Sequence, residues 1–254
     1  RGLGDVYKRQ VYGGFETGGL VGNSQKGNEF AVKDSKIKIN KVEFANLDKG
    51  TKTWFGVGGI AGNANIKTTI SNVQLTAYNG DSFIGSKKDN KPLATQTMNE
   101  GGLIGLSNGA CTITKTSVSV DVYGSNAGGF VGISKNQLSI NDCYYGETSE
   151  TSACGVYGYT SSGGMVGSQN AAVTISKSAV KNATIGIPTA KTGDAGIGGY
   201  VGIKANGDLK ISDCEVNNVT LSAEDKSNGA GAGGVIGHND GGNTYAYDIL
   251  IHKS

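Results

Sequence analysis

The residues of this chain that could do chemistry are few and lie far apart. Residues 105–109, GLSNG, match the G-x-S-x-G pattern that presents a nucleophilic serine on a turn between a strand and a helix. Such a site needs a helix and a histidine partner, and no amphipathic helical pattern follows. The equivalents of Ser107 in the internal repeats described below are Ser24, Ala64, Ser134, Gln169, Lys204 and Asn239. A position that varies so much within one chain indicates a polar turn, so we expect no catalysis at Ser107.

Two other segments resemble ligand sites only loosely. Residues 229–234, GAGAGG, are similar to a dinucleotide-binding glycine loop, but the seventh copy of a repeat follows them instead of a helix. Asp240, close to His238, could join a cation site with neighbouring carbonyls, but the pattern is not repeated and favours a solvated turn. The chain has 2 His and neither an HExxH nor a CxxC motif. We therefore expect no catalytic residue, no metal ligand and no cofactor.

The cysteines and the acidic residues also favour structural roles. Cys143 and Cys214 occupy equivalent positions two repeats apart, too far for a disulfide, and are interpreted as packed thiols. A bridge between Cys111 and Cys154, in or beside turns, stays an open alternative. Enzymes that cleave polysaccharides need clustered carboxylates, whereas the acids of this chain are scattered. The sequence therefore predicts that this chain is not an enzyme.

Aromatic side chains are the remaining candidates for a binding surface. Stacking on sugar rings along an exposed face would suit five tyrosines: Tyr78, Tyr123, Tyr144, Tyr157 and Tyr159. The alternative is that these rings cover the edges of the core. We keep them as candidate glycan-facing residues.

The first ten residues, RGLGDVYKRQ, have the sequence that the tail of a common transposase-based sequencing adaptor encodes. We therefore interpret residues 1–10 as a non-native scar and residues 11–254 as the protein, a fragment of a longer chain. Without the scar the chain has 20 Lys, no Arg, and 20 Asp plus Glu. This balance argues against a nucleic-acid partner. No apolar run reaches the roughly 18 residues of a membrane helix, so we expect no membrane insertion.

Internal repeats determine the expected fold. The motif GG-apolar-apolar-G occurs seven times, and its last four copies begin 35 residues apart. We expect its paired glycines to form a tight corner before a strand. These structural glycines are Gly18, Gly19, Gly58, Gly59, Gly101, Gly102, Gly128, Gly129, Gly163, Gly164, Gly198, Gly199, Gly233 and Gly234.

A second block, apolar-polar-polar-small-polar-apolar, follows each of the first six motifs. Its first residue is always isoleucine, and its residues alternate with a period of two. Units of this kind bury their apolar faces only by stacking. The sequence therefore predicts an all-β fold, a single-stranded β-solenoid (β-helix) of about seven Gly-rich repeats. The predicted core ladder is Ile39, Ile70, Ile113, Ile140, Ile175 and Ile211.

Two further columns of the repeat carry specific expectations. Adjacent strand residues face opposite sides, so we expect the second apolar residue of the glycine motif to point inward and the first to lie under a loop. The third residue of the second block alternates in charge from the third repeat onward and predicts a solvent-facing ladder. This column is Lys41, Asn72, Lys115, Asp142, Lys177 and Asp213.

The glycine motif and the second block together resemble the GLUG-motif repeats of bacterial surface proteins, over nearly all of residues 11–238. That family includes adhesin-like cell-surface proteins and the non-catalytic regions of immunoglobulin A peptidases. The resemblance implies a secreted, extracellular protein at the bacterial cell surface, acting as an adhesin or stalk. Its partner would be a host or extracellular polymer, a glycan or a protein surface. The alternative is an accessory, glycan-binding module of a larger secreted enzyme, such as a peptidase or a polysaccharide-degrading enzyme.

Overall fold

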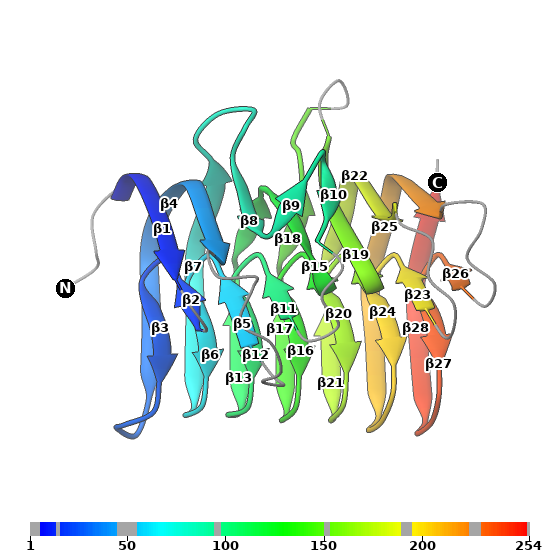
Figure 1. The fold of residues 1–254 in the computed structure, drawn as a ribbon. Coiled ribbons are helices and arrows are strands. Elements are labelled where there is room, and N and C mark those ends of the chain that lie inside the picture. The colour runs from blue at the N-terminus through cyan, green and yellow to red at the C-terminus, as the bar shows by residue number, and fades with distance from the viewer. Residues whose placement is uncertain are drawn as a thin grey trace.

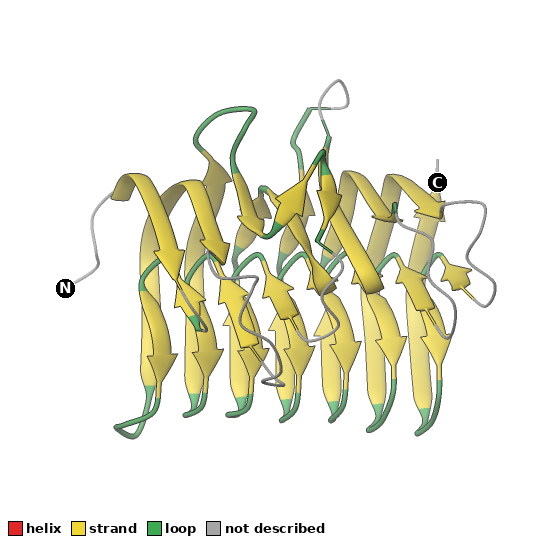
Figure 2. Ribbon diagram, viewed as in Figure 1, coloured by secondary structure: helices red, strands yellow, loops and turns green. Residues whose placement is uncertain are grey.

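The computed structural model describes residues 6–13, 16–44, 55–93, 98–149, 153–188, 195–223 and 230–252. Within these ranges the chain forms strands and turns and has no helix (Figure 2). The all-β class is therefore confirmed. All strand pairs are parallel except one short hairpin.

The strands belong to three sheets. The largest sheet holds β1 (Val6–Gly13), β2 (Thr17–Gly18), β4 (Phe30–Phe44), β5 (Phe55–Gly58), β7 (Thr68–Ala77), β8 (Phe83–Gly85), β11 (Met98–Gly101), β13 (Cys111–Thr114), β14 (Ser117–Ser119), β15 (Asp121–Gly128), β17 (Leu138–Asn141), β18 (Tyr144–Gly146), β19 (Cys154–Gly163), β21 (Val173–Ser176), β22 (Ala179–Ile187), β23 (Ala195–Gly198), β25 (Leu209–Ala223), β26 (Ala230–Gly233) and β28 (Thr244–His252). The second sheet holds β3 (Val21–Ser24), β6 (Ala61–Ala64), β12 (Ile104–Ser107), β16 (Val131–Ser134), β20 (Val166–Gln169), β24 (Val201–Lys204) and β27 (Ile236–Asn239). The hairpin consists of β9 (Lys87–Lys88) and β10 (Lys91–Pro92).

Each repeat contributes one strand to the seven-stranded sheet, and neighbouring strands come from successive repeats. The second apolar residues of the seven glycine motifs are paired along this sheet: Val21, Ala61, Ile104, Val131, Val166, Val201 and Ile236. Figure 1 shows the resulting seven turns of chain side by side, from β3 at one end to β27 at the other. We call the stretch of chain from one strand of this sheet to the next a turn.

A row of aliphatic side chains runs through the interior. Ile70, Ile113, Ile140, Ile175 and Ile211 are paired in register and are fully buried. The prediction was wrong for the first repeat, where Val32 pairs with Ile70 and Ile39 pairs with Ala77. The reason is distance along the chain. In four repeats the isoleucine follows the last motif glycine by eight residues, whereas Ile39 lies 17 residues after Gly22.

The third residue of the second block forms a corner in the backbone. Its members are Asp34, Asn72, Lys115, Asp142, Lys177 and Asp213, all with φ between 48° and 54°. Asp34 takes the place predicted for Lys41, which instead pairs with Phe83. Asn and Asp tolerate this left-handed conformation better than Lys does. The column thus bends each turn from one face to the next, and the attraction between its alternating charges stays a prediction.

The residue after this corner closes it with a hydrogen bond. Ser178 Oγ donates to the carbonyl of Ser176 at 2.7 Å and accepts the N–H of Cys143 from the preceding turn at 3.1 Å. Cys143 Sγ and Cys214 Sγ likewise donate to carbonyls two residues earlier, at 3.2 and 3.0 Å. This position therefore requires a small side chain that donates a hydrogen bond. The thiols of Cys143 and Cys214 meet this requirement in addition to packing in the core.

The motif glycines allow backbone to touch backbone. A Cβ on the first glycine of any copy would lie 1.9–2.2 Å from the carbonyl oxygen three residues later. A Cβ on Gly129 would lie 2.1 Å from the carbonyl oxygen of Gly164 in the next turn. The left-handed glycines are Gly27, Gly85, Gly146, Gly207 and Gly242, all outside the motif pairs. Close approach, and not positive φ, is thus the reason for the paired glycines.

Both apolar residues of the motif are buried and belong to the same hydrophobic core, while loop cover of the first residue stays a prediction. In the five inner copies each of these side chains has no exposed surface, as for Phe130 and Val131. The chain bends between the two glycines and the strand that follows, so the alternation of a straight strand does not apply. The bend is also hydrogen-bonded to the next turn, because Phe130 and Val131 both donate their N–H groups to the carbonyl of Met165.

The glycine contact predicts a sharp difference between two alanine substitutions. Gly129→Ala should lower the free energy of unfolding by about 3 kcal/mol or more, because the backbone of the next turn must move. A Cβ on Gly80 would meet no atom within 4 Å, so Gly80→Ala should change stability by less than about 1 kcal/mol. Urea denaturation followed by circular dichroism measures both. Equal effects would contradict the proposed contact.

The corner column predicts a stabilising substitution. Lys177→Asn should raise the free energy of unfolding by about 0.5–1 kcal/mol, because asparagine adopts positive φ more readily than lysine. Thr174→Asn, at an exposed and extended position of the same turn, should give no gain. The same denaturation experiment compares the two variants, and a gain at Thr174 but not at Lys177 would refute this interpretation.

Candidate functional site

The five predicted tyrosines do not form one surface. Tyr78 is 39% exposed, Tyr144, Tyr157 and Tyr159 are half-buried, and Tyr123 is only 4% exposed. Tyr123 is therefore corrected from a glycan-facing residue to a covered one. Of the five, the structure brings Tyr123 and Tyr157 into ring contact, with centroids 4.8 Å apart and planes 23° from parallel.

These two rings belong to an aromatic cluster of Phe83, Tyr123 and Tyr157. Tyr123 and Tyr157 are paired in register on β15 and β19, so they stack from one turn to the next. Phe83 on β8 meets Tyr123 edge to face, with centroids 6.1 Å apart. The ammonium of Lys87 lies 4.7 Å from the centroids of both Phe83 and Tyr123. The cluster thus combines stacking and cation–π attraction on one outer face.

The β9–β10 hairpin covers part of this cluster. Its strand β10 contacts β15 and β19, and the N–H of Ser86 donates to the carbonyl of Tyr123 at 3.0 Å (Figure 1). Asp89 and Asn90 form its turn with φ of 52° and 57°, as two-residue hairpin loops require. Lys87 of the hairpin, together with Phe83 and Tyr157, covers the ring of Tyr123.

Asp121 is the carboxylate of this region, and it holds two turns together. It accepts the N–H of Gly155 from the next turn at 2.8 Å, and its Oδ2 lies 3.3 Å from the hydroxyl of Tyr123. Burial raises the pKa of Asp121, while the hydrogen bond from Gly155 and the charge of Lys87 oppose that shift. The two oxygens of the Asp121 carboxylate are engaged by Gly155 and Tyr123, so this side chain is not free to act as a general base.

Small residues continue the column of Tyr157 in the next two turns. Tyr157 pairs with Gly186 in the next turn, and Gly186 pairs with Ser222 in the turn after that. A Cβ on Gly186 would be 3.8 Å from the Tyr157 ring, in ordinary contact. We name Tyr157, Gly186 and Ser222 the tyrosine strip. One aromatic ring beside small residues is an arrangement on which a sugar ring could stack.

A polar groove of about 560 Å³ lies on another part of the surface. It is lined by Glu16, Gln25, Asn63, Asn65, Leu106, Asn108 and Lys135. Three asparagines are paired from turn to turn at this groove, since Asn108 donates to Asn65 and Asn65 donates to Asn23, both at 2.6 Å. Glu16 accepts from Asn63 at 2.6 Å and from Asn23. These side chains stabilise the stack through an amide row.

Ser107 and its equivalents point into the turn that each of them precedes. Ser107 Oγ donates to the carbonyl of Gly109 at 3.0 Å, and Ser134 Oγ donates to that of Asn136 at 2.8 Å. Lys204, fully buried, donates from Nζ to the carbonyl of Gly241. Four members of the column thus donate to turn carbonyls, namely Ser107, Ser134, Gln169 and Lys204, whereas Ser24 Oγ accepts the N–H of Asn65 at 3.3 Å. Its chemical diversity concealed that role in the sequence.

His238 contacts Asp240 through Nε2 and Oδ1. Within the described ranges, no group of three or more His, Cys, Asp or Glu side chains is placed to hold a metal ion. The four cysteines are buried and free, so the Cys111–Cys154 bridge is not formed. Burial raises the pKa of Cys111 and Cys154 to about 12, which keeps both as unreactive thiols at neutral pH.

One buried acid escaped the sequence interpretation. Glu100 has no exposed surface, accepts the N–H of Ser125 at 3.0 Å, and leaves its Oε1 without a hydrogen-bond partner. It fits there because a Cβ on Gly124 would lie 1.8 Å from its Oε2. Burial raises the pKa of Glu100 well above its usual range. Its equivalents Val57 and Ala127 mark the position as interior, and that was the available signal.

No family model, curated protein or solved structure matches the chain. The resemblance to GLUG-motif repeats therefore stays a prediction. Within the described residues, no helix is long and apolar enough to cross a membrane.

Glu100 predicts an unusual dependence of stability on pH. Folding raises the pKa of Glu100. The contribution of this side chain to the free energy of unfolding is therefore most favourable below the pKa that it has in the unfolded chain, and it is lost as the pH rises toward the pKa that it has in the folded chain. Glu100→Gln removes this titration and keeps the acceptor for Ser125. The stability advantage of the variant over the parent should therefore grow between pH 4 and pH 8, by up to about 1.4 kcal/mol per pH unit.

Urea denaturation at several pH values measures the effect. Glu100→Ala provides a second variant that does not titrate, with lower stability because it leaves a cavity. Its difference from the parent should change with pH in the same direction. Curves parallel to the parent for both variants would contradict a neutral, buried Glu100.

Proposed function

We propose that the chain is a β-solenoid that serves as a non-catalytic spacer in a secreted protein of the bacterial cell surface. The observation that carries this proposal is the unbroken register of one strand per repeat across seven turns. Stacked strands rise by about 4.8 Å per turn, so seven turns span roughly 34 Å. Such a stack is a short rod whose length is set by the number of its repeats.

The polar chemistry of the interior supports a mechanical role. Side-chain ladders join successive turns, as from Asn141 to Ser176 at 2.7 Å and from Asn218 to Asn182 at 2.8 Å. Asp121 and Glu16 are likewise engaged between turns. These contacts use polar groups for cohesion, and a rod under load benefits from cohesion along its axis.

Attachment to a partner would use the sides of the rod. The resemblance to GLUG-motif repeats, together with the tyrosine strip, favours adhesion to a host or extracellular glycan as the accompanying role. The same strip favours the second candidate, a glycan-binding accessory module of a larger secreted enzyme. Both candidates place the contact at Tyr157 and assign no catalysis to this chain.

Deleting one repeat tests the spacer. Removal of residues 128–162 joins Ala127 to Gly163 and takes out one complete 35-residue unit. The shortened chain should still unfold cooperatively, and its longest dimension in small-angle scattering should fall by about 5 Å. Loss of folding, or an unchanged length, would refute an additive stack of turns.

A glycan and mucin array tests adhesion. The parent chain should bind at least one sugar class, and Tyr157→Ala should weaken that binding about five- to thirteenfold, since a stacked ring contributes on the order of 1–1.5 kcal/mol. Tyr245→Ala, at another exposed tyrosine, is the matched control and should bind like the parent. Binding that resists Tyr157→Ala would refute the tyrosine strip, and no binding at all would leave the spacer as the function.

A further inference from the structure

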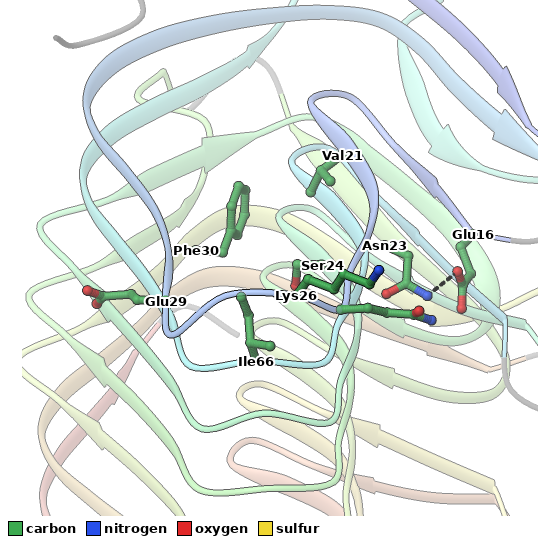
Figure 3. A pocket seen from close by; sticks show the side chains of 9 residues that line it. Glu16, Val21, Asn23, Ser24, Lys26, Glu29, Phe30 and Ile66 are labelled. Carbon is green, nitrogen blue, oxygen red and sulfur yellow. Dashed lines mark hydrogen bonds between the residues drawn. The ribbon is translucent and has the colours of Figure 1, made fainter.

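Short loops join the strands of the second sheet to the largest sheet, and these loops differ in length. Figure 3 shows the first loop beside the second, with Lys26 in one and Ile66 in the other. Three residues join β12 to β13, whereas four residues join β24 to β25. Both of these loops contain an Asn-Gly pair, Asn108–Gly109 in the first case and Asn206–Gly207 in the second. The same two residue types thus occur in a shorter and in a longer loop.

In the shorter loop, hydrogen bonds to the preceding turn hold both residues. The N–H groups of Asn108 and Gly109 donate to the carbonyl of Ala64 at 2.9 and 2.8 Å. The side-chain amide of Asn108 donates to Oδ1 of Asn65 at 2.6 Å, and Gly109 is buried. The backbone nitrogen of Gly109 is therefore directed at another residue and not at the side chain of Asn108.

In the longer loop, the additional residue shifts these hydrogen bonds by one position. The N–H groups of Ala205 and Asn206 donate to the carbonyl of Gln169 at 2.9 and 3.1 Å, so Gly207 has no part in this pair. The N–H of Gly207 donates instead to Oδ1 of Asn206 at 2.8 Å, and Asn206 is exposed. The backbone nitrogen of Gly207 thus lies beside the side-chain amide of the preceding asparagine, and glycine has no Cβ to hinder their approach.

We propose that Asn206 deamidates spontaneously and that the longer loop is the cause of its reactivity. The N–H of Gly207 loses its proton, the nitrogen bonds to Cγ of Asn206, and the bond from Cγ to Nδ2 breaks as ammonia leaves with that proton. Water then opens the five-membered imide at one of its two carbonyl carbons and gives aspartate or isoaspartate. One water enters and one ammonia leaves, so the reaction needs no oxidant and no cofactor.

The product changes the loop in two ways. A carboxylate replaces a neutral amide close to the exposed Asp208, and isoaspartate carries the main chain through its own side chain, which lengthens the backbone. The loop is bound across the stack, because Nε2 of Gln169 donates to the carbonyl of Asp208 at 3.0 Å. A longer backbone at Asn206 opposes that contact. This inference goes beyond the spacer function and does not rest on it.

The chain has two further Asn-Gly pairs. Oδ1 of Asn79 accepts the N–H of Asp81 at 3.2 Å and the hydroxyl of Ser82 at 2.9 Å. That side chain is therefore directed past Gly80, and Asn79 should react more slowly than the proposed site. Asn228–Gly229 lies outside the described residues and stays out of the comparison.

Peptide mass spectrometry tests the proposal on the folded chain. The parent is kept near pH 8 and about 37 °C, and each conversion adds about 1 Da to the peptide that contains it. Asn206 should convert about tenfold faster than Asn108. In about 8 M urea the two rates should agree within about twofold, because the loops no longer exist. Asn206→Asp, which has no amide to lose, is the control and should abolish the mass change in its peptide.

Exchanging the two loop lengths makes the test reciprocal. Deletion of Ala205 leaves three residues between β24 and β25 and should slow Asn206 to about the rate of Asn108. Insertion of one alanine between Ser107 and Asn108 should speed Asn108 toward the rate of Asn206. Circular dichroism shows whether each variant keeps the β signal of the parent, and the comparison within the parent decides where a variant does not fold. Equal rates of Asn108 and Asn206 in the folded parent, or a difference that persists in urea, would overturn the proposal.

Discussion

Direct contact between backbones at the glycine corner is the constraint on which this structure depends. Each second glycine from Gly19 to Gly199 lies so close to a carbonyl of the following turn that a Cβ would be 2.0–2.3 Å from its oxygen. Because the corner admits no side chain, it brings successive turns to the spacing of paired strands. The N–H groups of Phe130 and Val131 then bond to the next turn, and the apolar columns beside the corner become continuous.

The close spacing of successive turns also determines the hydrogen bonds that polar groups make. A narrow interior leaves little room for water, so each buried donor or acceptor needs a protein partner. Ser178, Ser107 and Lys204 satisfy carbonyls or N–H groups at corners and turns, and the amide rows satisfy one another. Glu100 is an exception whose cost is reduced by protonation. These polar side chains therefore contribute to cohesion between successive turns.

The aromatic cluster lies on a side of the stack, where rings from successive turns meet. The sides carry the aromatic cluster, where a hairpin covers Tyr123 and leaves Tyr157 beside small residues. The two stacked tyrosines thus differ in exposure, because the ring of Tyr123 lies between Phe83 and Tyr157 with Lys87 over it.

The amino-acid sequence alone predicted the all-β class, the seven repeats and five isoleucines of the inner row. It could do so because the repeats of one chain can be aligned with one another, which shows the positions that are equivalent. Local spacing could not place Ile39 or Lys41, since the first repeat is longer and only pairing with the second turn selects Val32 and Asp34. Nor could it show that both motif columns join one core, that Asp34 and its equivalents form a corner, or that Lys87 of a hairpin lies over Tyr123. Those features depend on where the backbone bends and on what lies across from it in the next turn, and only the tertiary structure decides such contacts.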